Sequence, residues 1–152
     1  MSEVFSSPDF EAKYTYHGWD LGATWSPTET LFKLWAPTAD HAALRLYRTG
    51  NPDAKDLIAE LPMEPSVNGT WQLRKAGDLN GIYYTFVVTI GAYRAEACDP
   101  YAKTTGVNGM RAMVIDMAST NPDGWELDAD PNGDLNFTDA VIYELHVRDL
   151  SI

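Results

Sequence analysis

The sequence predicts an all-β protein built as an antiparallel β-sandwich, and three observations support this prediction. Between Leu21 and Asp116, short runs that alternate in polarity or are rich in Val, Tyr and Thr follow one another at short intervals. Segments rich in Gly, Asn, Asp and Pro separate these runs as turns. No part of this region has a convincing helical period.

The first half of the sandwich is expected to contain three strands. The run 30–37 alternates in polarity and ends at a proline, and 42–48 places Leu44 and Leu46 on the face opposite to Arg45. The loop 51–55 leads to a third short strand at 57–61.

The second half begins with an Asn68-Gly69 turn, which is typical of a hairpin and precedes the strand 71–75. The run 82–90 is rich in Tyr, Val and Thr and is expected to be a central strand. A Gly91-Ala92 turn leads to the strand 93–97, and 112–117 closes the series. Trp35 and Trp71 lie within alternating strands and are expected to pack in the core.

Composition narrows the classes of function. The chain has 152 residues and a net charge of −11, which argues against nucleic acids and anionic membrane surfaces as partners. The N-terminus lacks the pattern of a signal peptide, and one cysteine allows no internal disulfide. These features favour a soluble cytoplasmic protein.

The sequence offers no catalytic motif. Its three histidines are far apart, and no nucleophile, phosphate-binding or metalloprotease pattern is present. One segment, 128–139, fits the spacing of a calcium-binding loop. Its candidate ligands are Asp128, Asp130, Asn132, Asn136 and Asp139. Because Pro122 and Gly124 prevent an entering helix, a solvated acidic linker without a cofactor is the favoured interpretation, and calcium is the alternative.

A sugar-binding surface is the second candidate site. Glucan chains bind by stacking the apolar faces of their rings on flat aromatic side chains. Tyr93, just past the Gly91-Ala92 turn, is placed to present such a ring.

Five segments of the sequence resemble segments of a known enzyme family. Five blocks occur in the order found at the start of type I pullulanases of the alpha-amylase superfamily, glycoside hydrolase family 13. They include "DLNGIYYTFVV", "NPDGWE" and "DAVIYELHVRDLSI", and they span 14–47, 78–88, 97–117, 121–126 and 139–152. Arg148-Asp149 favours the pullulanase branch over the isoamylase branch.

The resemblance implies four parts of the chain. Residues 1–20 would be a lead-in, and 21–117 an immunoglobulin-like sandwich of carbohydrate-binding module family 48. Residues 118–138 would be a linker, and 139–152 the first strand of a (β/α)8 catalytic barrel that is otherwise missing from this chain.

The resemblance also implies a function. Family members hydrolyse α-1,6 links in pullulan, starch or glycogen with retention, using two carboxylates on later barrel strands. No catalytic residue is therefore expected in this segment, which should be inactive alone. Its expected partners are α-glucan and its own catalytic barrel.

The family's glycogen-binding relatives use two Trp and a Lys. Tyr93 stands in place of one Trp and Thr85 in place of the Lys, so binding is expected to be weak or absent. Asn108 and Arg111 are expected to line either the sugar surface or the surface that contacts the barrel. Two alternatives stay open: a stand-alone glycogen- or starch-binding module, and an immunoglobulin-like interaction domain without sugar binding.

Overall fold

The computed structural model describes residues 5, 7–130, 133 and 136–151. The chain forms two compact units, Met1–Ser119 and Thr120–Ile152. The first unit contains every strand that the described residues form. Among the described residues, no helix combines the length and the apolar character needed to cross a lipid bilayer.

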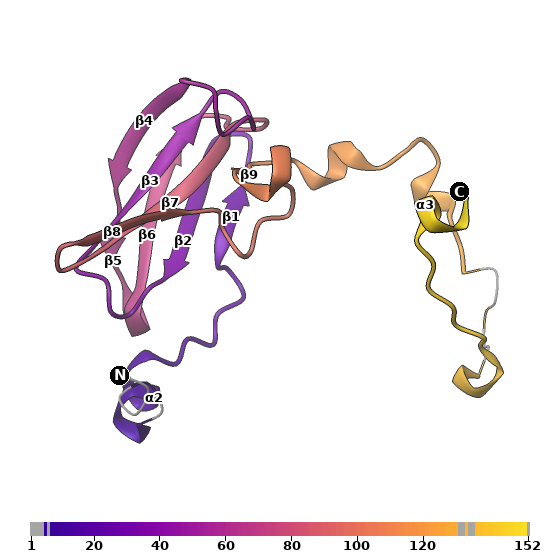
Figure 1. The fold of residues 1–152 in the computed structure, drawn as a ribbon, viewed down its shortest axis with the longest axis horizontal. Coiled ribbons are helices and arrows are strands. Elements are labelled where there is room, and N and C mark those ends of the chain that lie inside the picture. Colours follow the sequence, from indigo (N-terminus) through magenta and orange to yellow (C-terminus); the bar gives the residue numbers. More distant parts are fainter. Residues whose placement is uncertain (1–4, 6, 131–132, 134–135, 152) are drawn as a thin grey trace. The chain divides into compact units, whose positions relative to one another are not determined.

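The first unit is a sandwich of two antiparallel sheets, which confirms the predicted fold class (Figure 1). The first sheet has the order β1-β2-β6-β5, with bounds Gly22–Trp25, Glu29–Trp35, Thr70–Ala76 and Glu64–Pro65. The second has the order β4-β3-β7-β8, with bounds Leu57–Pro62, His41–Tyr47, Tyr83–Ile90 and Tyr93–Ala97. A short strand, β9 (Ala112–Met113), also pairs with β7.

The core lies between the two sheets. Phe32 on β2 and Tyr84 on β7 are almost completely buried, and their rings meet edge to face with centroids 5.0 Å apart. Leu44 on β3 pairs in register with Phe86 on β7, and both side chains enter this core. Alternation along β3 and β7 therefore directs the opposite set of side chains to the outer surface of the second sheet.

Several elements differ from the sequence prediction. A helix, α2 (Pro8–Tyr14), begins after Ser7, whose side chain accepts a hydrogen bond from the Phe10 backbone N–H. Because α2 spans only two turns, its amphipathic period was too short to recognise. Strands β1 and β5 were not predicted, and only Ala112–Met113 of the predicted 112–117 run is a strand.

The prediction of core packing holds for Trp71 and is wrong for Trp35. Trp71 packs against the core cluster. Trp35 is 41% exposed because it follows Phe32 on the opposite parity of β2. Its indole N–H donates to the backbone oxygens of Tyr14 (2.8 Å) and Asn68 (3.1 Å). Trp35 thus binds the N-terminal segment to the outside of the first sheet.

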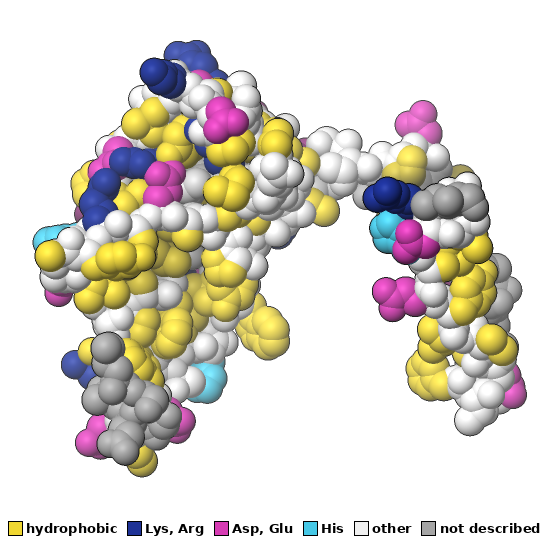
Figure 2. All heavy atoms as spheres, viewed as in Figure 1, with side chains coloured by type: hydrophobic (Ala, Val, Ile, Leu, Met, Phe, Trp, Pro, Cys, Tyr) yellow, Lys and Arg dark blue, Asp and Glu magenta, His cyan; other side chains and the backbone are white. Residues whose placement is uncertain are grey.

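The second unit differs from the barrel strand expected over 139–152. Its described residues form two 3-10 turns, Trp125–Leu127 and Phe137–Asp139, and a short helix, α3 (Val147–Leu150). A strand requires a neighbour that completes its hydrogen bonds, and no described segment pairs with 140–146. Large apolar side chains consequently lie exposed along this unit, among them Phe137, Val141 and Ile142. Figure 2 shows hydrophobic side chains on the surface of this unit.

Candidate functional site

The outer face of the β4-β3-β7-β8 sheet carries a continuous set of polar side chains. Strand register places Arg45 on β3 between Glu60 on β4 and Thr85 on β7. It also places Thr89 on β7 opposite Arg94 on β8. Basic and acidic side chains lie next to each other on the visible surface of the sandwich (Figure 2). We call this surface the outer face.

Ion pairs connect these strands across the outer face. Arg45 Nε donates to Glu60 Oε2 at 2.7 Å, and Arg45 Nη1 donates to Glu96 Oε2 at 2.5 Å. Arg94 Nη2 donates to the other oxygen of Glu60, also at 2.7 Å. Hydrogen bonds from Arg45 and then Arg94 lower the pKa of Glu60 below the ordinary value of a glutamate. Glu60 therefore stays ionised and holds β3, β4 and β8 together.

This lowered pKa predicts an acid-dependent loss of stability. The ionised Glu60 stabilises the folded state above its ordinary pKa, and that contribution disappears as the pH falls through the lowered pKa. We expect the variant Glu60→Gln to be modestly less stable than wild type at pH 7, with the difference shrinking between roughly pH 5 and 3. Urea unfolding at each pH measures this, with exposed Glu64→Gln as the control. A pH-independent difference for Glu60→Gln would contradict the assignment.

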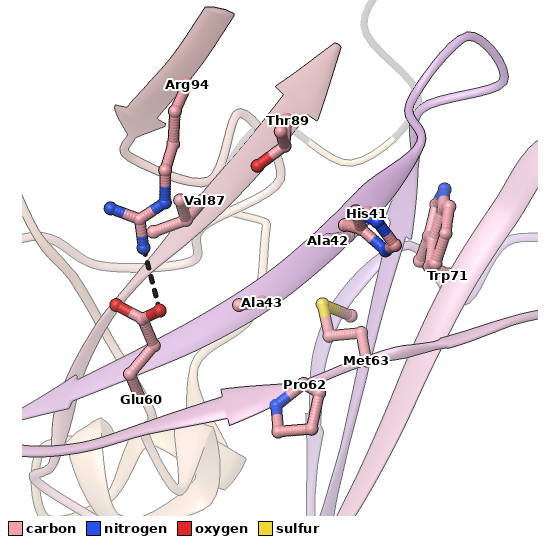
Figure 3. Close-up of a pocket in the computed structure, with 10 residues that line it drawn as sticks. All are labelled: His41, Ala42, Ala43, Glu60, Pro62, Met63, Trp71, Val87, Thr89 and Arg94. Carbon is pink, nitrogen blue, oxygen red and sulfur yellow. Dashed lines mark hydrogen bonds and ion pairs between the residues drawn. The ribbon is translucent and has the colours of Figure 1, made fainter. Parts of the chain in front are cut away.

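A shallow groove of about 280 Å³ lies at one end of the outer face (Figure 3). Glu60 and Arg94 point toward each other on one side of it, and His41, Met63 and Trp71 lie on the other. Its other lining residues are Ala42, Ala43, Pro62, Val87 and Thr89. The groove combines an apolar floor with hydroxyl, imidazole and guanidinium groups at its rim. Such a surface suits a small polar ligand, although both oxygens of Glu60 already accept hydrogen bonds, from Arg45 and Arg94.

The other end of the outer face is closed by Arg111. This side chain is 5% exposed, and its guanidinium lies 3.7 Å from the centre of the Tyr47 ring. Arg111 Nη1 donates to Asp56 Oδ1 and to the Thr49 backbone oxygen, both at 2.8 Å. We call this group of Arg111, Tyr47 and Asp56 the Arg111 clamp, because it fixes the loop before β4 to the start of β9.

Glu96 connects the clamp to the rest of the outer face. Tyr47 Oη and Thr85 Oγ1 both donate to Glu96 Oε1, the latter at 2.6 Å. Burial is the main cause that raises the pKa of Tyr47, so its phenol stays protonated and available as a donor. Thr85 is 2% exposed. The position where glycogen-binding relatives are expected to carry a Lys is thus occupied by a buried hydroxyl that already has its acceptor.

The predicted sugar-binding residues do not come together in one place. Tyr93 is 68% exposed and pairs with Ile90 at the tip of the β7–β8 hairpin. Alternation along β8 directs its ring to the face opposite Glu96, and therefore opposite Thr85. Arg111 precedes β9, which pairs with the other end of β7, roughly 20 Å from Tyr93 at about 3.4 Å per residue.

Asn108 is also distant from Tyr93. It is exposed within the 3-10 turn Val107–Gly109 and has a φ of 55°. This left-handed conformation is one that Asn tolerates better than most residues. Asn108 therefore shapes the turn just before Arg111. This turn lies near the Tyr83 end of β7, whereas the hairpin tip lies at the Ile90 end.

Sequence reasoning named none of the four residues Arg45, Glu60, Arg94 and Glu96 as part of a site. Arg45 and Arg94 occupy polar positions of alternating strands, and this alternation was the available signal that both side chains lie on an exposed face of a sheet. Their partners Glu60 and Glu96 are distant in the sequence, and only the strand register shows which acid faces which base.

The calcium hypothesis stays a prediction. Asn132 lies outside the described residues, whereas Asp128, Asp130, Asn136 and Asp139 are exposed. Asn136 Nδ2 donates to Asp139 Oδ2 at 3.3 Å. Over the described parts of the chain, no three His, Cys, Asp or Glu side chains converge on a point where they could hold a metal ion.

Comparison with known proteins points to one group of enzymes. Residues 20–102 match the family model of carbohydrate-binding module 48, described as the isoamylase N-terminal domain. A chloroplastic pullulanase of Arabidopsis thaliana is 34% identical over 147 residues, which cover 91% of this chain and 15% of that protein. A pullulanase of Bacillus subtilis is 32% identical over 152 residues, which cover 100% of this chain and 20% of that protein.

The solved structures that this chain resembles are also pullulanases. A pullulanase from Paenibacillus barengoltzii, in complex with maltohexaose and α-cyclodextrin, superposes with a TM-score of 0.87 and is 50% identical. The match covers 95% of this chain and 22% of that one. A pullulanase from Bacillus acidopullulyticus superposes with a TM-score of 0.74 at 38% identity, over 83% of this chain and 15% of that one. The chain thus spans a fifth or less of the curated relatives described above.

Proposed function

The chain belongs to the carbohydrate-binding module 48 family, and from this premise we propose that it is the non-catalytic N-terminal module of a pullulanase-type enzyme. One observation carries this proposal. The match to the Paenibacillus barengoltzii enzyme runs through 95% of this chain at 50% identity and occupies 22% of that enzyme. A similarity that extends over both units supports a shared role within a longer enzyme.

In that role the parent protein hydrolyses α-1,6 links in pullulan, starch or glycogen, and the module contributes to glucan binding and to packing against the catalytic barrel. Exposed apolar side chains in the second unit support the packing role, since such surfaces mark contacts with other domains. We place this function in the cytoplasm, which the single cysteine and the acidic composition support.

Glucan binding is supported by the family and by the complexes that its relatives form. A neutral glucan also suits the outer face, because Arg45 and Arg111 already form ion pairs with Glu60, Glu96 and Asp56 and leave no free positive charge for an anionic ligand. Tyr93 provides an exposed ring at the hairpin tip. We therefore expect weak binding of α-glucan by the 152-residue chain, without release of reducing sugar from pullulan.

Affinity electrophoresis through gels with and without glycogen tests this proposal. We expect the chain to be retarded by glycogen and Tyr93→Ala to bind about 2- to 12-fold more weakly, since an aromatic ring contributes roughly 0.5–1.5 kcal/mol by stacking. Tyr143→Ala, which removes a tyrosine that is 79% exposed in the second unit, is the matched control. Unretarded wild-type protein would reject glucan binding, and reducing sugar released by protein free of host amylases would reject the non-catalytic role.

A further inference from the structure

An aromatic groove of about 400 Å³ lies beside the start of β1, away from the outer face. It is lined by Tyr16, His17, Gly18, Trp19, Leu21 and Tyr101. The relative exposure of Trp19 is 102%, and that of Tyr101 is 57%. Two flat side chains from distant parts of the sequence thus present their faces to solvent at one place. We call this feature the aromatic groove.

The N-terminal side of the groove is held in a fixed conformation. Tyr16 Oη donates to Asp20 Oδ1, and Lys33 Nζ binds both Asp20 and Tyr16 Oη, the latter at 3.1 Å. Lys33 is 9% exposed. A Cβ at Gly18 would collide with the Tyr16 ring, so glycine at this position lets the segment fold tightly around that ring. The segment that carries Trp19 is therefore preorganised.

The other side of the groove is positioned from the core. The Tyr101 backbone N–H donates to Asp99 Oδ1 at 2.9 Å, and Tyr84 Oη donates to Asp99 Oδ2 at 2.6 Å. Asp99 is 4% exposed. Gly22 has a φ of 91°, and a Cβ there would lie 3.0 Å from Tyr101 Cβ. The turn that carries Tyr101 thus lies directly against β1 and cannot move independently of the core.

The chemistry of the lining selects a class of ligand. The lining contains one imidazole, that of His17, and no carboxylate, Lys or Arg. Within the described residues, the Trp19 indole N–H and the Tyr101 hydroxyl make no hydrogen bond to protein. An apolar protein surface would leave these groups unsatisfied, whereas a sugar has both apolar ring faces and hydroxyls. The volume falls within the range of about 300–1,000 Å³ typical of ligand sites.

We infer that the aromatic groove binds α-glucan, with pyranose rings stacked on Trp19 and Tyr101 and sugar hydroxyls bonded to His17. This inference rests on the proposed glucan-binding function and names a site distinct from the outer face and from Tyr93. Preorganisation favours the groove, because hydrogen bonds hold the Tyr16 side chain and the Tyr101 backbone in place before a ligand binds.

Glycogen affinity electrophoresis of the full 152-residue chain tests the inference. We expect Trp19→Ala to weaken binding about tenfold and Tyr101→Ala about threefold, while Trp19→Phe keeps most of it. Trp125→Ala is the matched control, since Trp125 is 55% exposed in the other unit. Near-ultraviolet circular dichroism confirms that each variant has kept its fold.

The outcomes separate this inference from the proposed function. If wild type is retarded and Trp19→Ala behaves like wild type, the aromatic groove is not the site, although glucan binding stands. If Tyr93→Ala loses binding while Trp19→Ala and Tyr101→Ala keep it, the aromatic groove is again not the site. If wild type is not retarded by glycogen, both the inference and the proposed glucan binding fail.

Discussion

Replacing Gly106 by alanine is expected to lower the free energy of unfolding by about 3 kcal/mol. Gly106 lies against Gly50, where the loop before β4 crosses the loop before β9. A Cβ at Gly106 would lie 2.6 Å from the Gly50 backbone oxygen, and a Cβ at Gly50 would lie 2.6 Å from Gly106 Cα. Two backbones touch here, so the clash cannot be relieved by the rotation of a side chain.

Urea unfolding followed by tryptophan fluorescence measures this effect. Gly109→Ala is the matched control, because Gly109 is in the same loop and a Cβ there meets nothing within 4 Å. Its φ of 67° still costs the alanine about 1–2 kcal/mol. Equal unfolding midpoints for the two variants would show that the loops separate easily and that the close contact is not structurally important.

The variant Arg111→Met is expected to destabilise the sandwich by a similar amount, about 3 kcal/mol. The substitution keeps an apolar chain over the Tyr47 ring and removes the guanidinium. Backbone oxygens of Thr49 and Ala54, at 2.8 and 3.3 Å, then lose the Arg111 donor. Asp56 Oδ1 loses its donor as well, whereas Asp56 Oδ2 still accepts from the Thr49 backbone N–H and hydroxyl. These groups are held by a side chain that is 5% exposed, so water replaces the lost hydrogen bonds poorly.

Arg94→Met provides the comparison, since Arg94 forms an ion pair with Glu60 with its own side chain 47% exposed. Exposed ion pairs typically contribute less than about 1 kcal/mol, so this variant should unfold close to wild type. A double-mutant cycle of Arg111→Met with Asp56→Asn isolates the coupling in the clamp. If the Arg111 and Arg94 variants unfold alike, the Arg111 clamp contributes no more to stability than an exposed ion pair does.

The strands were predictable because their signal is local. Strands β3 and β7 follow the predicted runs to within a residue or so, since alternation and β-branched composition are visible in a short window. Helix α2 was missed because it is short. The strand expected over 139–152 depends on a neighbouring strand, and no local pattern can supply one.

The candidate sites were less predictable because they depend on register and on turns. Tyr93 was correctly expected beyond the Gly91-Ala92 turn, yet its face of the sheet follows from the pairing of Ile90 with Tyr93. Arg111 was expected to line a binding or docking surface, and only the folded loop shows that Asp56 and Tyr47 enclose it. Trp19 and Tyr101 line one groove because Gly22 allows the Tyr101 turn to approach β1 closely, which composition does not reveal.

The placement of the first and last strands has a mechanical consequence. Strand β1 lies at the edge of one sheet, whereas β9, the last strand, pairs with β7 in the other. Tension applied between the two ends of the sandwich therefore passes from layer to layer through the packed core, including the contact between Phe32 and Tyr84. We therefore expect the resistance of the sandwich to stretching to come from side-chain packing between the two sheets as well as from hydrogen bonds between adjacent strands.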